Sequence, residues 1–333
     1  MNCELEDKIF SISEDDFDAL ALEIFRFQCR HNEIYRQFVG ELNIDPSTVA
    51  HIAQIPFLPV GFFKRHEIKT GAFEPEAVFE SSGTTRSGNS RHAVKRMSLY
   101  RGSFLKAFRQ FYGSPEDWCI IGLLPSYLER RDSSLVVMVD ELIAQSKKAD
   151  SGFYLYETDK LISVLKKNEK AGQKTLLIGV TFALLDLAAQ YRDKLRHTVV
   201  METGGMKGRR KELTREETHA LLKEAWGLPA IHSEYGMTEL LSQAYSCGDG
   251  LFRLPPWMKI VLREEDDPLS VRTAVSARPF LNGIINVIDL ANIYSASFIA
   301  VDDIGRLYPD GSFTVTGRMD GSDVRGCNLM YGI

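Results

Sequence analysis

Between residues 118 and 235 the chain alternates short apolar runs with amphipathic segments, and this alternation limits the folds open to it. Residues 118–124, 175–180 and 198–201 are apolar runs of a length typical of buried parallel strands. Residues 216–226 instead have the apolar spacing of a helix. Strands that alternate with helices indicate βαβ units, so the sequence predicts an α/β fold with a parallel sheet. We expect a further apolar run, residues 135–139, to be another strand.

The two ends of the chain differ from this central pattern. Residues 14–38 have broadly helical apolar spacing and predict surface helices that cover a core. Beyond Phe252, strand-like pieces at residues 284–289 and 313–316 are separated by turn signals such as Pro309-Asp310-Gly311. We therefore predict layered α/β sheets in a nucleotide-binding core over residues 1–250, including the N-terminal helical segment. A smaller β-rich subdomain is predicted over residues 251–319.

Composition excludes several classes of protein. The 40 basic and 45 acidic residues leave a formal charge of −5, so no global positive field attracts nucleic acid. No apolar run approaches the roughly 18 residues that a membrane-spanning helix needs, and the acidic start is unlike a signal peptide. We expect a cytoplasmic protein. The 5 cysteines form no C-x-x-C pair and their number is odd, so we expect thiols rather than a disulfide framework.

A polar loop, residues 81–90, follows the strand-like residues 77–79. Its glycines let the backbone approach an anion, and its hydroxyls and N–H groups can donate to phosphate oxygens. The alternative is an ordinary solvent-exposed loop. Asn89 stands where a P-loop requires lysine, which argues against a P-loop NTPase. The candidate phosphate-binding residues are Ser81, Ser82, Gly83, Thr84, Thr85 and Gly88.

Two further motifs carry chemistry suited to a nucleotide. In residues 233–239 an aromatic ring, a hydroxyl and a carboxylate follow one another as Tyr235, Thr238 and Glu239. An aromatic ring can stack on a purine, and a carboxylate is a hard oxygen ligand for Mg²⁺. Downstream, Asp303 precedes a predicted hairpin and Arg318 follows it. A carboxylate can accept from ribose hydroxyls and an arginine can hold phosphate, although acidic turns are most often simply solvated.

The order of these motifs resembles that of the adenylate-forming (acyl-CoA synthetase-like) superfamily. Within it the chain looks most like the LuxE-type acyl-protein synthetases, which activate fatty acids for bioluminescence-type acyl reductases. The resemblance covers most of the chain. It is carried by residues 55–60 (IPFLPV), 79–85 (FESSGTT), 233–239 (SEYGMTE) and 317–328 (GRMDGSDVRGCN).

The resemblance implies ATP and Mg²⁺ as cofactors and a role for each motif. The loop from Ser81 to Gly88 would hold the β- and γ-phosphates, and Thr238 and Glu239 would contact the α-phosphate and Mg²⁺. Tyr235 and Gly236 would flank the adenine. A glycine-rich segment would lie beside it, although the same residues could also form an ordinary turn. Asp303 would take the ribose hydroxyls, with Arg318 on the same nucleotide. The glycine-rich segment contains Gly204 and Gly205.

The chain stops at Ile333, shortly after the position of the family hinge at Asp320, where most of the superfamily continues into a mobile domain. This ending fits the LuxE-like type, in which the acyl group passes to a cysteine near the C-terminus. Cys327 lies in that position within the tail, residues 320–333, and Arg325 offers a charge that could lower its pKa. The alternative for Cys327 is an inert tail cysteine.

The resemblance therefore implies activation of a carboxylic acid, expected to be a long-chain fatty acid, as acyl-AMP. The acyl group would then pass to a protein thiol and on to a partner acyl reductase or carrier protein. A ligase of the acyl- or aryl-CoA type and a non-catalytic nucleotide- or acyl-binding subunit stay open as alternatives. Four histidines have no metal-ligand spacing and are expected at surface or core positions: His66, His92, His197 and His232. Of these, His232 is the one that we place near the site.

Overall fold

The computed structural model describes residues 3–81, 88–125, 130–204, 213–273 and 278–319. The chain forms two compact units. Unit 1 comprises Met1–Phe104, Gly236–Gln243 and Arg253–Ser322. Unit 2 comprises Leu105–Tyr235, Ala244–Phe252 and Asp323–Ile333. Each unit is described by itself below, and the domain boundaries expected from the sequence stay predictions.

Unit 2 contains the predicted parallel sheet. Its strands follow the order β5-β4-β6-β7-β8, all parallel, and the antiparallel β9 continues the sheet beyond β8. The predicted strands at 118–124, 175–180 and 198–201 are confirmed as β4, β6 and β7. The strands of this sheet are β4 (Cys119–Leu123), β5 (Gly152–Phe153), β6 (Thr175–Gly179), β7 (Thr198–Glu202), β8 (His232–Tyr235), β9 (Ala244–Ser246) and β10 (Leu251–Arg253).

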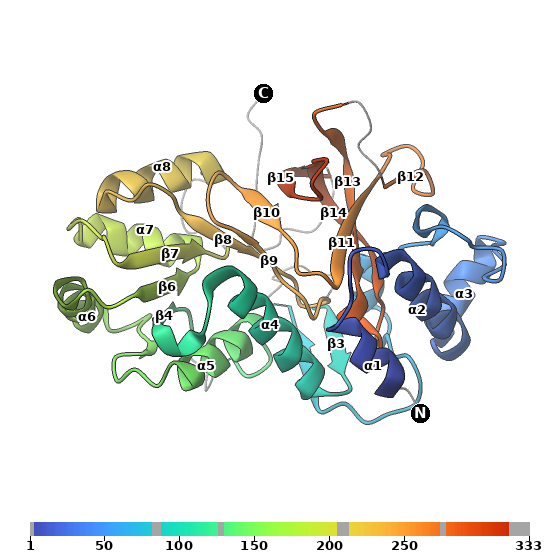
Figure 1. Cartoon of the computed structure of the whole chain (residues 1–333), viewed down its shortest axis with the longest axis horizontal. Helices are drawn as coiled ribbons and strands as arrows, with labels where there is room; N and C mark the ends of the chain where they lie inside the picture. Colours follow the sequence, from blue (N-terminus) through green and yellow to red (C-terminus); the bar gives the residue numbers. More distant parts are fainter. Residues whose placement is uncertain (1–2, 82–87, 126–129, 205–212, 274–277, 320–333) are drawn as a thin grey trace. The chain divides into compact units, whose positions relative to one another are not determined.

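Helices cover both faces of this sheet, as continuous apolar strands require. Figure 1 shows α7 and α8 on one side of β7, β6 and β4, away from α5. One buried cluster joins α6, α7 and α8 to alternate residues of the strands, including Ile121, Leu177 and Val200. The predicted helix at 216–226 is confirmed as α8. The helices are α5 (Ser134–Ser146), α6 (Thr158–Ala171), α7 (Thr181–Gln190) and α8 (Arg215–Trp226).

The expected strand at residues 135–139 is wrong, because this run lies in helix α5. The Ser133 hydroxyl caps the helix by accepting from the backbone N–H of Val136. Buried side chains then recur at Val136, Val139 and Leu142, which is helical spacing that extends past the short apolar run. Periodicity alone does not separate a short buried strand from the first turns of a buried helix.

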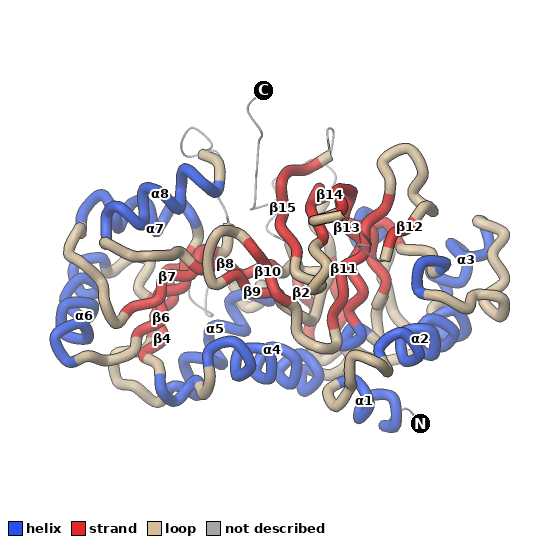
Figure 2. Tube along the Cα trace, turned by 45° about the horizontal axis from the view of Figure 1, so that its top comes forward, coloured by secondary structure: helices blue, strands red, loops and turns tan. Residues whose placement is uncertain are grey.

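Unit 1 contains the β-rich part of the chain. Figure 2 shows β11, β13, β14 and β15 side by side, and their neighbours pair antiparallel in the order β12-β11-β13-β14-β15. β1 pairs parallel to β14, and β2 and β3 form a separate antiparallel pair. The strands of unit 1 are β1 (Leu58–Pro59), β2 (Ala77–Glu80), β3 (Arg91–Val94), β11 (Met258–Arg263), β12 (Val271–Arg272), β13 (Leu281–Asp289), β14 (Phe298–Leu307) and β15 (Phe313–Arg318).

The predicted N-terminal helices are confirmed in unit 1 and pack on β14. The ring of Phe298 meets Phe25 edge-on at 6.1 Å and stacks on Tyr35 at 6.3 Å. The helices are α1 (Cys3–Ile9), α2 (Phe17–His31) and α3 (Glu33–Glu41), and α4 (Met97–Tyr112) joins the two units. Four short 3-10 segments complete the described elements: η1 (Ile52–Gln54), η2 (Val60–Lys64), η3 (Pro115–Asp117) and η4 (Leu290–Asn292).

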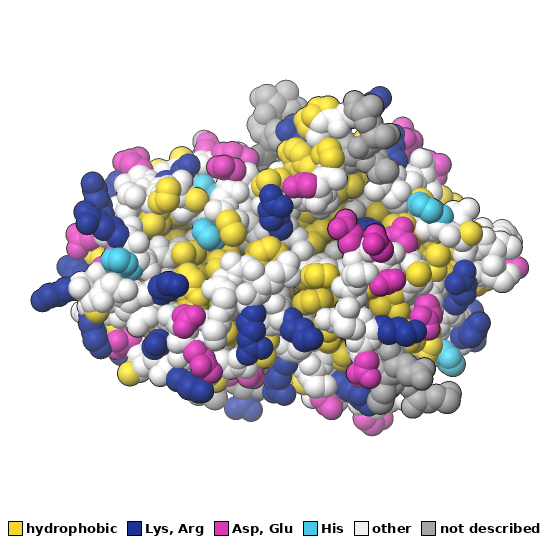
Figure 3. All heavy atoms as spheres, in the orientation of Figure 1, with side chains coloured by type: hydrophobic (Ala, Val, Ile, Leu, Met, Phe, Trp, Pro, Cys, Tyr) yellow, Lys and Arg dark blue, Asp and Glu magenta, His cyan; other side chains and the backbone are white. Residues whose placement is uncertain are grey.

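Charged side chains are distributed rather than clustered on the surface in view. Figure 3 shows acidic and basic groups interspersed on this face, the pattern expected from a small net charge. Every helix in the described ranges is too short or too polar to cross a bilayer.

Candidate functional site

The base of the predicted phosphate loop lies at the ends of β2 and β3 in unit 1. The Ser81 N–H donates to the Ser90 carbonyl at 3.0 Å, and the Ser90 N–H donates to Ser81 Oγ at 2.9 Å. Gly88 has φ +84°, which a residue with a side chain rarely adopts. The reciprocal bonds close the loop, so the Ser81 hydroxyl already has a structural partner. Four predicted phosphate ligands lie outside the described residues: Ser82, Gly83, Thr84 and Thr85.

The Thr238–Glu239 motif also lies in unit 1, in a turn between β8 and β9. The Leu240 N–H donates to the Met237 carbonyl at 3.1 Å, which closes the turn. His92 on β3 donates from Nδ1 to the Thr238 carbonyl at 2.8 Å. Glu239 is 1% exposed. The structure therefore connects the strand that follows the predicted phosphate loop to the predicted catalytic turn.

Two more buried side chains hold the backbone of this turn. Asn292 donates from Nδ2 to the Glu239 carbonyl at 2.8 Å. Asp289 Oδ2 accepts from the N–H groups of Leu241 and Ser242 at 2.8 and 2.9 Å. Burial raises the pKa of Asp289 to about 6, although these hydrogen bonds act in the opposite direction. We call His92, Asn292 and Asp289 the turn clamp.

Asp303 and Arg318 are brought together, as their predicted roles on one nucleotide require. They face each other across β14 and β15, and Arg318 Nε lies 3.3 Å from Asp303 Oδ1. The Arg318 guanidinium also lies 3.7 Å from the carboxylate of Asp302. The Arg318 and Asp303 side chains are 10% and 15% exposed, so water screens this pair less than a surface ion pair. Asp303 lies within the β14 strand of the hairpin, not in a turn before it.

Gly204 lies in unit 2, directly after β7. Its φ of +82° suits glycine, and its N–H donates to Glu202 Oε1 at 2.7 Å while its carbonyl accepts from the Thr181 N–H at 3.0 Å. Both backbone groups of Gly204 are thus fixed. Gly205, its predicted companion, lies outside the described residues.

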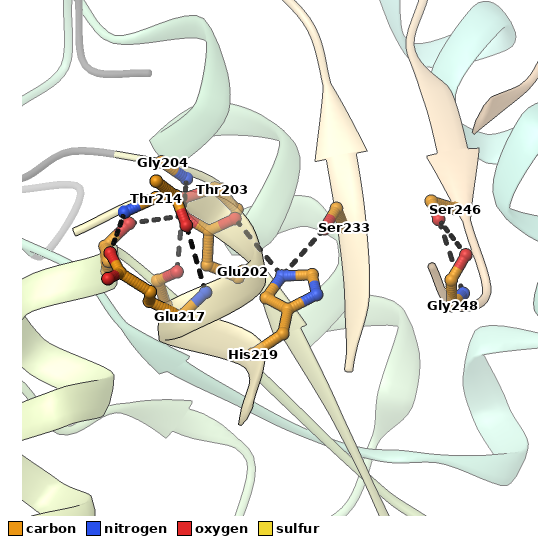
Figure 4. Close-up of polar contacts among 11 residues, drawn as sticks. Glu202, Thr203, Gly204, Thr214, Glu217, His219, Ser233, Ser246 and Gly248 are labelled. Carbon is orange, nitrogen blue, oxygen red and sulfur yellow. Dashed lines mark hydrogen bonds and ion pairs between the residues drawn. The ribbon is translucent and has the colours of Figure 1, made fainter. Parts of the chain in front are cut away.

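A buried network surrounds Glu202 at the carboxyl ends of β6, β7 and β8. The Thr181 hydroxyl donates to the carboxylate. Figure 4 shows the His219 ring between Glu202 and Ser233, with Nε2 at 3.9 Å from Oε2 of Glu202 and 3.4 Å from Ser233 Oγ. Burial raises the pKa of Glu202, but contacts with His219 and Thr181 and the charge of Arg215 outweigh it and lower the pKa.

Tyr235 is buried at the end of β8 in unit 2, where its ring packs on Phe252 at 5.7 Å. The neighbouring Glu234 lies opposite Tyr245 on β9. Burial and the nearby Glu202 charge raise the pKa of Glu234 to about 8. His232 lies beside α4, and its Nδ1 is 3.1 Å from the Tyr112 hydroxyl. Gly236 follows Tyr235 and belongs to unit 1.

The cysteines fall into distinct environments. Cys29 and Cys119 are buried, as expected of Cys119 in its core strand, and Cys247 is exposed. Burial raises the pKa of Cys29 to about 12, which makes this thiol a poor nucleophile. Cys327, the predicted acyl acceptor, lies outside the described residues.

The predicted Mg²⁺ position rests on the single carboxylate of Glu239. The described residues contain no group of three or more histidine, cysteine or acidic side chains that could hold a metal ion by themselves. Mg²⁺ in nucleotide sites is held by one or two carboxylates together with phosphate oxygens and water. A buried carboxylate on a fixed turn therefore fits Mg²⁺ that is bound together with ATP.

The amino-acid sequence was compared with known protein families, and one family matches nearly the whole chain. The sequence matches the family described as acyl-protein synthetase, LuxE, over residues 5–332. The chain belongs to the LuxE acyl-protein synthetase family. The resemblance noted from the motifs is confirmed at this level. No protein of curated function matches the sequence.

Solved structures similar to this LuxE-family chain are longer proteins. O-succinylbenzoate coenzyme A synthetase (MenE) from Bacillus subtilis, solved with ATP and magnesium ion, has a TM-score of 0.48 and 15% identity over 74% of this chain and 52% of its own. MbtA from Mycobacterium smegmatis has a TM-score of 0.44 and 15% identity over 73% and 46%. The amide bond synthetase McbA from Marinactinospora thermotolerans has a TM-score of 0.45 and 18% identity over 66% and 45%. The chain spans about half the length of these structures.

Sequence reasoning missed the side chains that hold the LuxE-family motifs in place. His92 was expected only to occupy a core or surface position, and Asn292, Asp289 and Glu202 were not singled out. Their partners lie tens to hundreds of residues away, as in the Asn292 contact with Glu239 at a separation of 53 residues. The one local signal was His92 itself, a polar residue in the short β3 strand directly after the polar loop.

Proposed function

We propose that the chain activates a carboxylic acid with ATP as an acyl-adenylate and then transfers the acyl group to a protein thiol. The family match over residues 5–332 carries this proposal. The geometry of unit 1 supports it, because His92 connects the strand after the predicted phosphate loop to the Thr238–Glu239 turn. Asp303 and Arg318 add a carboxylate and a guanidinium in contact with each other.

In the first step an oxygen of the substrate carboxylate forms a bond to the α-phosphorus of ATP. The bond from that phosphorus to the bridging oxygen breaks, and pyrophosphate leaves with the electron pair. Ser82, Gly83, Thr84 and Thr85, with Ser81 and Gly88 at the loop base, donate to the β- and γ-phosphates and stabilise the charge on the leaving group. Thr238 donates to the α-phosphate.

A further set of residues holds the nucleoside in this proposal. Asp303 accepts from the ribose hydroxyls, and Arg318 orients Asp303 and adds positive charge beside the nucleotide. Tyr235, Gly236, Gly204 and Gly205 form the adenine site. Glu239 holds Mg²⁺, which when bound neutralises phosphate charge.

In the second step the Cys327 thiolate attacks the carbonyl carbon of the acyl-adenylate. The bond from carbon to the phosphate oxygen breaks, AMP leaves, and a thioester remains. We propose a long-chain fatty acid as substrate and an acyl reductase or carrier protein as the next acceptor. A cytoplasmic location belongs to the same proposal.

The test of the first step is exchange of radiolabelled pyrophosphate into ATP, with a panel of fatty and aryl acids and without coenzyme A. We expect exchange that depends on the acid and is fastest with long-chain fatty acids. Exchange only with aryl acids would contradict the proposed substrate. ATP binding without exchange would instead favour a non-catalytic nucleotide-binding subunit.

The test of the second step uses labelled acid and ATP. We expect a hydroxylamine-sensitive label on the protein that is lost in Cys327→Ala, while Cys247→Ala, which removes the exposed thiol of the described part, keeps it. Label that persists in Cys327→Ala would overturn the acceptor assignment. Rapid release of acyl-coenzyme A with no protein label would favour a coenzyme A ligase.

A further inference from the structure

We infer that His92 is a positioning residue for the proposed adenylation, which ties the Thr238–Glu239 turn to β3 and to the Ser81–Ser90 base of the polar loop through its bond to the Thr238 carbonyl. The inference rests on the proposed function for its catalytic consequence. The bond itself is a feature of unit 1 alone, since His92, Thr238 and Glu239 all belong to that unit.

The bond fixes the protonation of the imidazole ring. A backbone carbonyl only accepts, so His92 Nδ1, at 2.8 Å from the Thr238 oxygen, must carry the proton. Burial is the main influence on His92 and lowers its pKa, although the Thr238 carbonyl, the Glu239 carboxylate and the Asn292 side chain act in the opposite direction. The hydrogen bond therefore places a ring proton on the nitrogen that faces the turn.

The position of the ring is fixed as well. His92 is 1% exposed, it lies opposite Phe79 across β2 and β3, and the ring of Phe63 meets it edge-on at 5.7 Å. Its Nε2 is buried, and the described residues give it no hydrogen-bond partner within normal geometry. A ring turned over by 180° would place the Cδ2 carbon where Nδ1 lies and would lose the bond to Thr238.

The turn clamp acts on backbone atoms. His92 and Asn292 donate to the successive carbonyls of Thr238 and Glu239, and Asp289 accepts from the N–H groups of Leu241 and Ser242. Fixing both carbonyls fixes the direction in which the two side chains leave the backbone. A buried carbonyl that loses its donor is left unsatisfied, which favours rotation of the peptide unit.

His92 differs from the rest of the turn clamp in what it connects. It lies two residues beyond Ser90, whose backbone closes the base of the predicted phosphate loop, whereas Asn292 and Asp289 lie on η4 and at the end of β13. β3 is short and paired with β2 throughout. A shift of the His92 ring therefore changes how the turn lies relative to Ser81 and Ser90 at the base of the loop.

The test compares two substitutions that differ in one donor. In His92→Leu the volume is similar but the donor to Thr238 is lost. In His92→Asn the amide nitrogen occupies the place of Nδ1 along the side chain and keeps a donor. Since an error of about 1 Å in a catalytic group can cost about 100-fold, we expect acid-dependent pyrophosphate exchange to fall about 10- to 100-fold in His92→Leu. We expect the exchange rate of His92→Asn to lie within about 3-fold of wild type. In His92→Leu the loss should appear more in kcat and in the Mg²⁺ dependence than in KM.

A second readout does not depend on activity. Trp257 donates from its indole N–H to Ser242 Oγ at 3.1 Å and to Ser103 Oγ at 3.0 Å, so it reports on the end of the turn. Its indole ¹H–¹⁵N NMR signal is assigned with Trp257→Phe. We expect this signal to shift in His92→Leu and to return in His92→Asn, while the signals of Trp118 and Trp226 in unit 2 stay unchanged.

The outcomes separate the inference from the function on which it rests. If wild type does not exchange pyrophosphate, the proposed function fails, and the Trp257 signal still decides whether His92 positions the turn. An unshifted Trp257 signal, or exchange in His92→Leu equal to wild type, overturns the inference. The inference is also overturned if both His92→Leu and His92→Asn lose pyrophosphate exchange in proportion to their loss of thermal stability. If His92→Leu does not fold, His92→Gln gives the comparison, because its amide reaches the place of Nε2 and not that of Nδ1.

Discussion

Two buried glutamates, one in each unit, are held in opposite ways. Glu202 in unit 2 is 7% exposed and its carboxylate is used in contacts with Thr181, Gly204 and His219. Glu239 in unit 1 is 1% exposed, and the hydrogen bond that it receives from the turn clamp goes to its backbone carbonyl. In unit 2 the Glu202 side chain stabilises the loop after β7. In unit 1 the surrounding side chains position the turn that carries Glu239, the proposed Mg²⁺ ligand.

The comparison shows that burial of a carboxylate does not by itself mark a catalytic group. Glu202 has the features of a structural residue, because its carboxylate accepts hydrogen bonds from Thr181 and Gly204 that hold the local backbone. Its contacts with His219 and Thr181 also lower its pKa. Glu239 follows Thr238 in a turn whose backbone carbonyls accept hydrogen bonds from His92 and Asn292. Substitution should therefore separate the two residues, with activity lost at Glu239 and stability lost at Glu202.

The largest effect is expected for Glu239→Gln. The substitution keeps the size of the side chain and removes the charge proposed to hold Mg²⁺, so acid-dependent pyrophosphate exchange should fall at least about 100-fold. Thermal unfolding should stay close to that of wild type, because the turn clamp uses the backbone. The matched control is Glu217→Gln, in the exposed capping box of α8, which should leave exchange unchanged. Near-normal exchange by folded Glu239→Gln would contradict the assignment.

The second effect concerns stability in unit 2. Glu202→Leu leaves the Thr181 hydroxyl and the Gly204 N–H buried without their acceptor, so unit 2 should lose about 2 kcal/mol of stability. Glu202→Gln keeps an acceptor oxygen and should lose less. Buried thiols report each unit separately, since Cys119 lies in β4 of unit 2 and Cys29 in α2 of unit 1.

The measurement is the rate of thiol labelling under native conditions, with Cys3, Cys247 and Cys327 replaced by serine. A loss of about 2 kcal/mol should raise the labelling rate of Cys119 about 30-fold in Glu202→Leu. Cys29 should label at the wild-type rate. Equal acceleration at both thiols would show that the two units do not open independently, and the contrast between the two glutamates would lose its basis.

The third effect is a pH dependence of stability. The pKa of Glu234 is raised to about 8 in the folded chain, from an ordinary 4.5. Between these values the folded state keeps a proton that the unfolded state releases, so stability falls as pH rises, by up to about 1.4 kcal/mol per pH unit for one proton. Glu234→Gln should remove this slope, as measured by urea unfolding from pH 5 to 9.

Asp289 in unit 1 sharpens the same experiment. Its pKa is raised to about 6, so its contribution has the same sign but ends near that pH. Asp289 is present in both proteins, so its contribution cancels from the difference in unfolding free energy between Glu234→Gln and wild type, and this difference should keep growing from pH 6 to 8 although the slope due to Asp289 has ended. Parallel curves across this range would show that Glu234 is ionised in the folded chain.

The α/β class, the parallel strands β4, β6 and β7, the helix α8 and the LuxE family could be predicted from the sequence, because each depends on local periodicity or on motif order. The strand expected at residues 135–139 was wrong because the cap at Ser133 and the continuation to Leu142 decide for a helix. The turn clamp could not be predicted. It depends on contacts such as His92 with Thr238, 146 residues apart, which local patterns do not contain.

The smallest effect is expected for Ser233→Ala, and it tests whether the unit 2 network is purely structural. Ser233 Oγ lies 3.4 Å from His219 Nε2, near the limit of a hydrogen bond, so its loss should cost about 0.5 kcal/mol in unfolding free energy. Exchange should stay within about 2-fold of wild type, because the bond is weak and Glu202 keeps Thr181 and Gly204. Because Ser233 joins His219 to β8, which ends at Tyr235, the variant also tests the route from the network to the proposed adenine site. A loss of exchange above about 10-fold with unchanged stability would mean that unit 2 positions the nucleotide through this network, and Glu202 would then act like the turn clamp of unit 1.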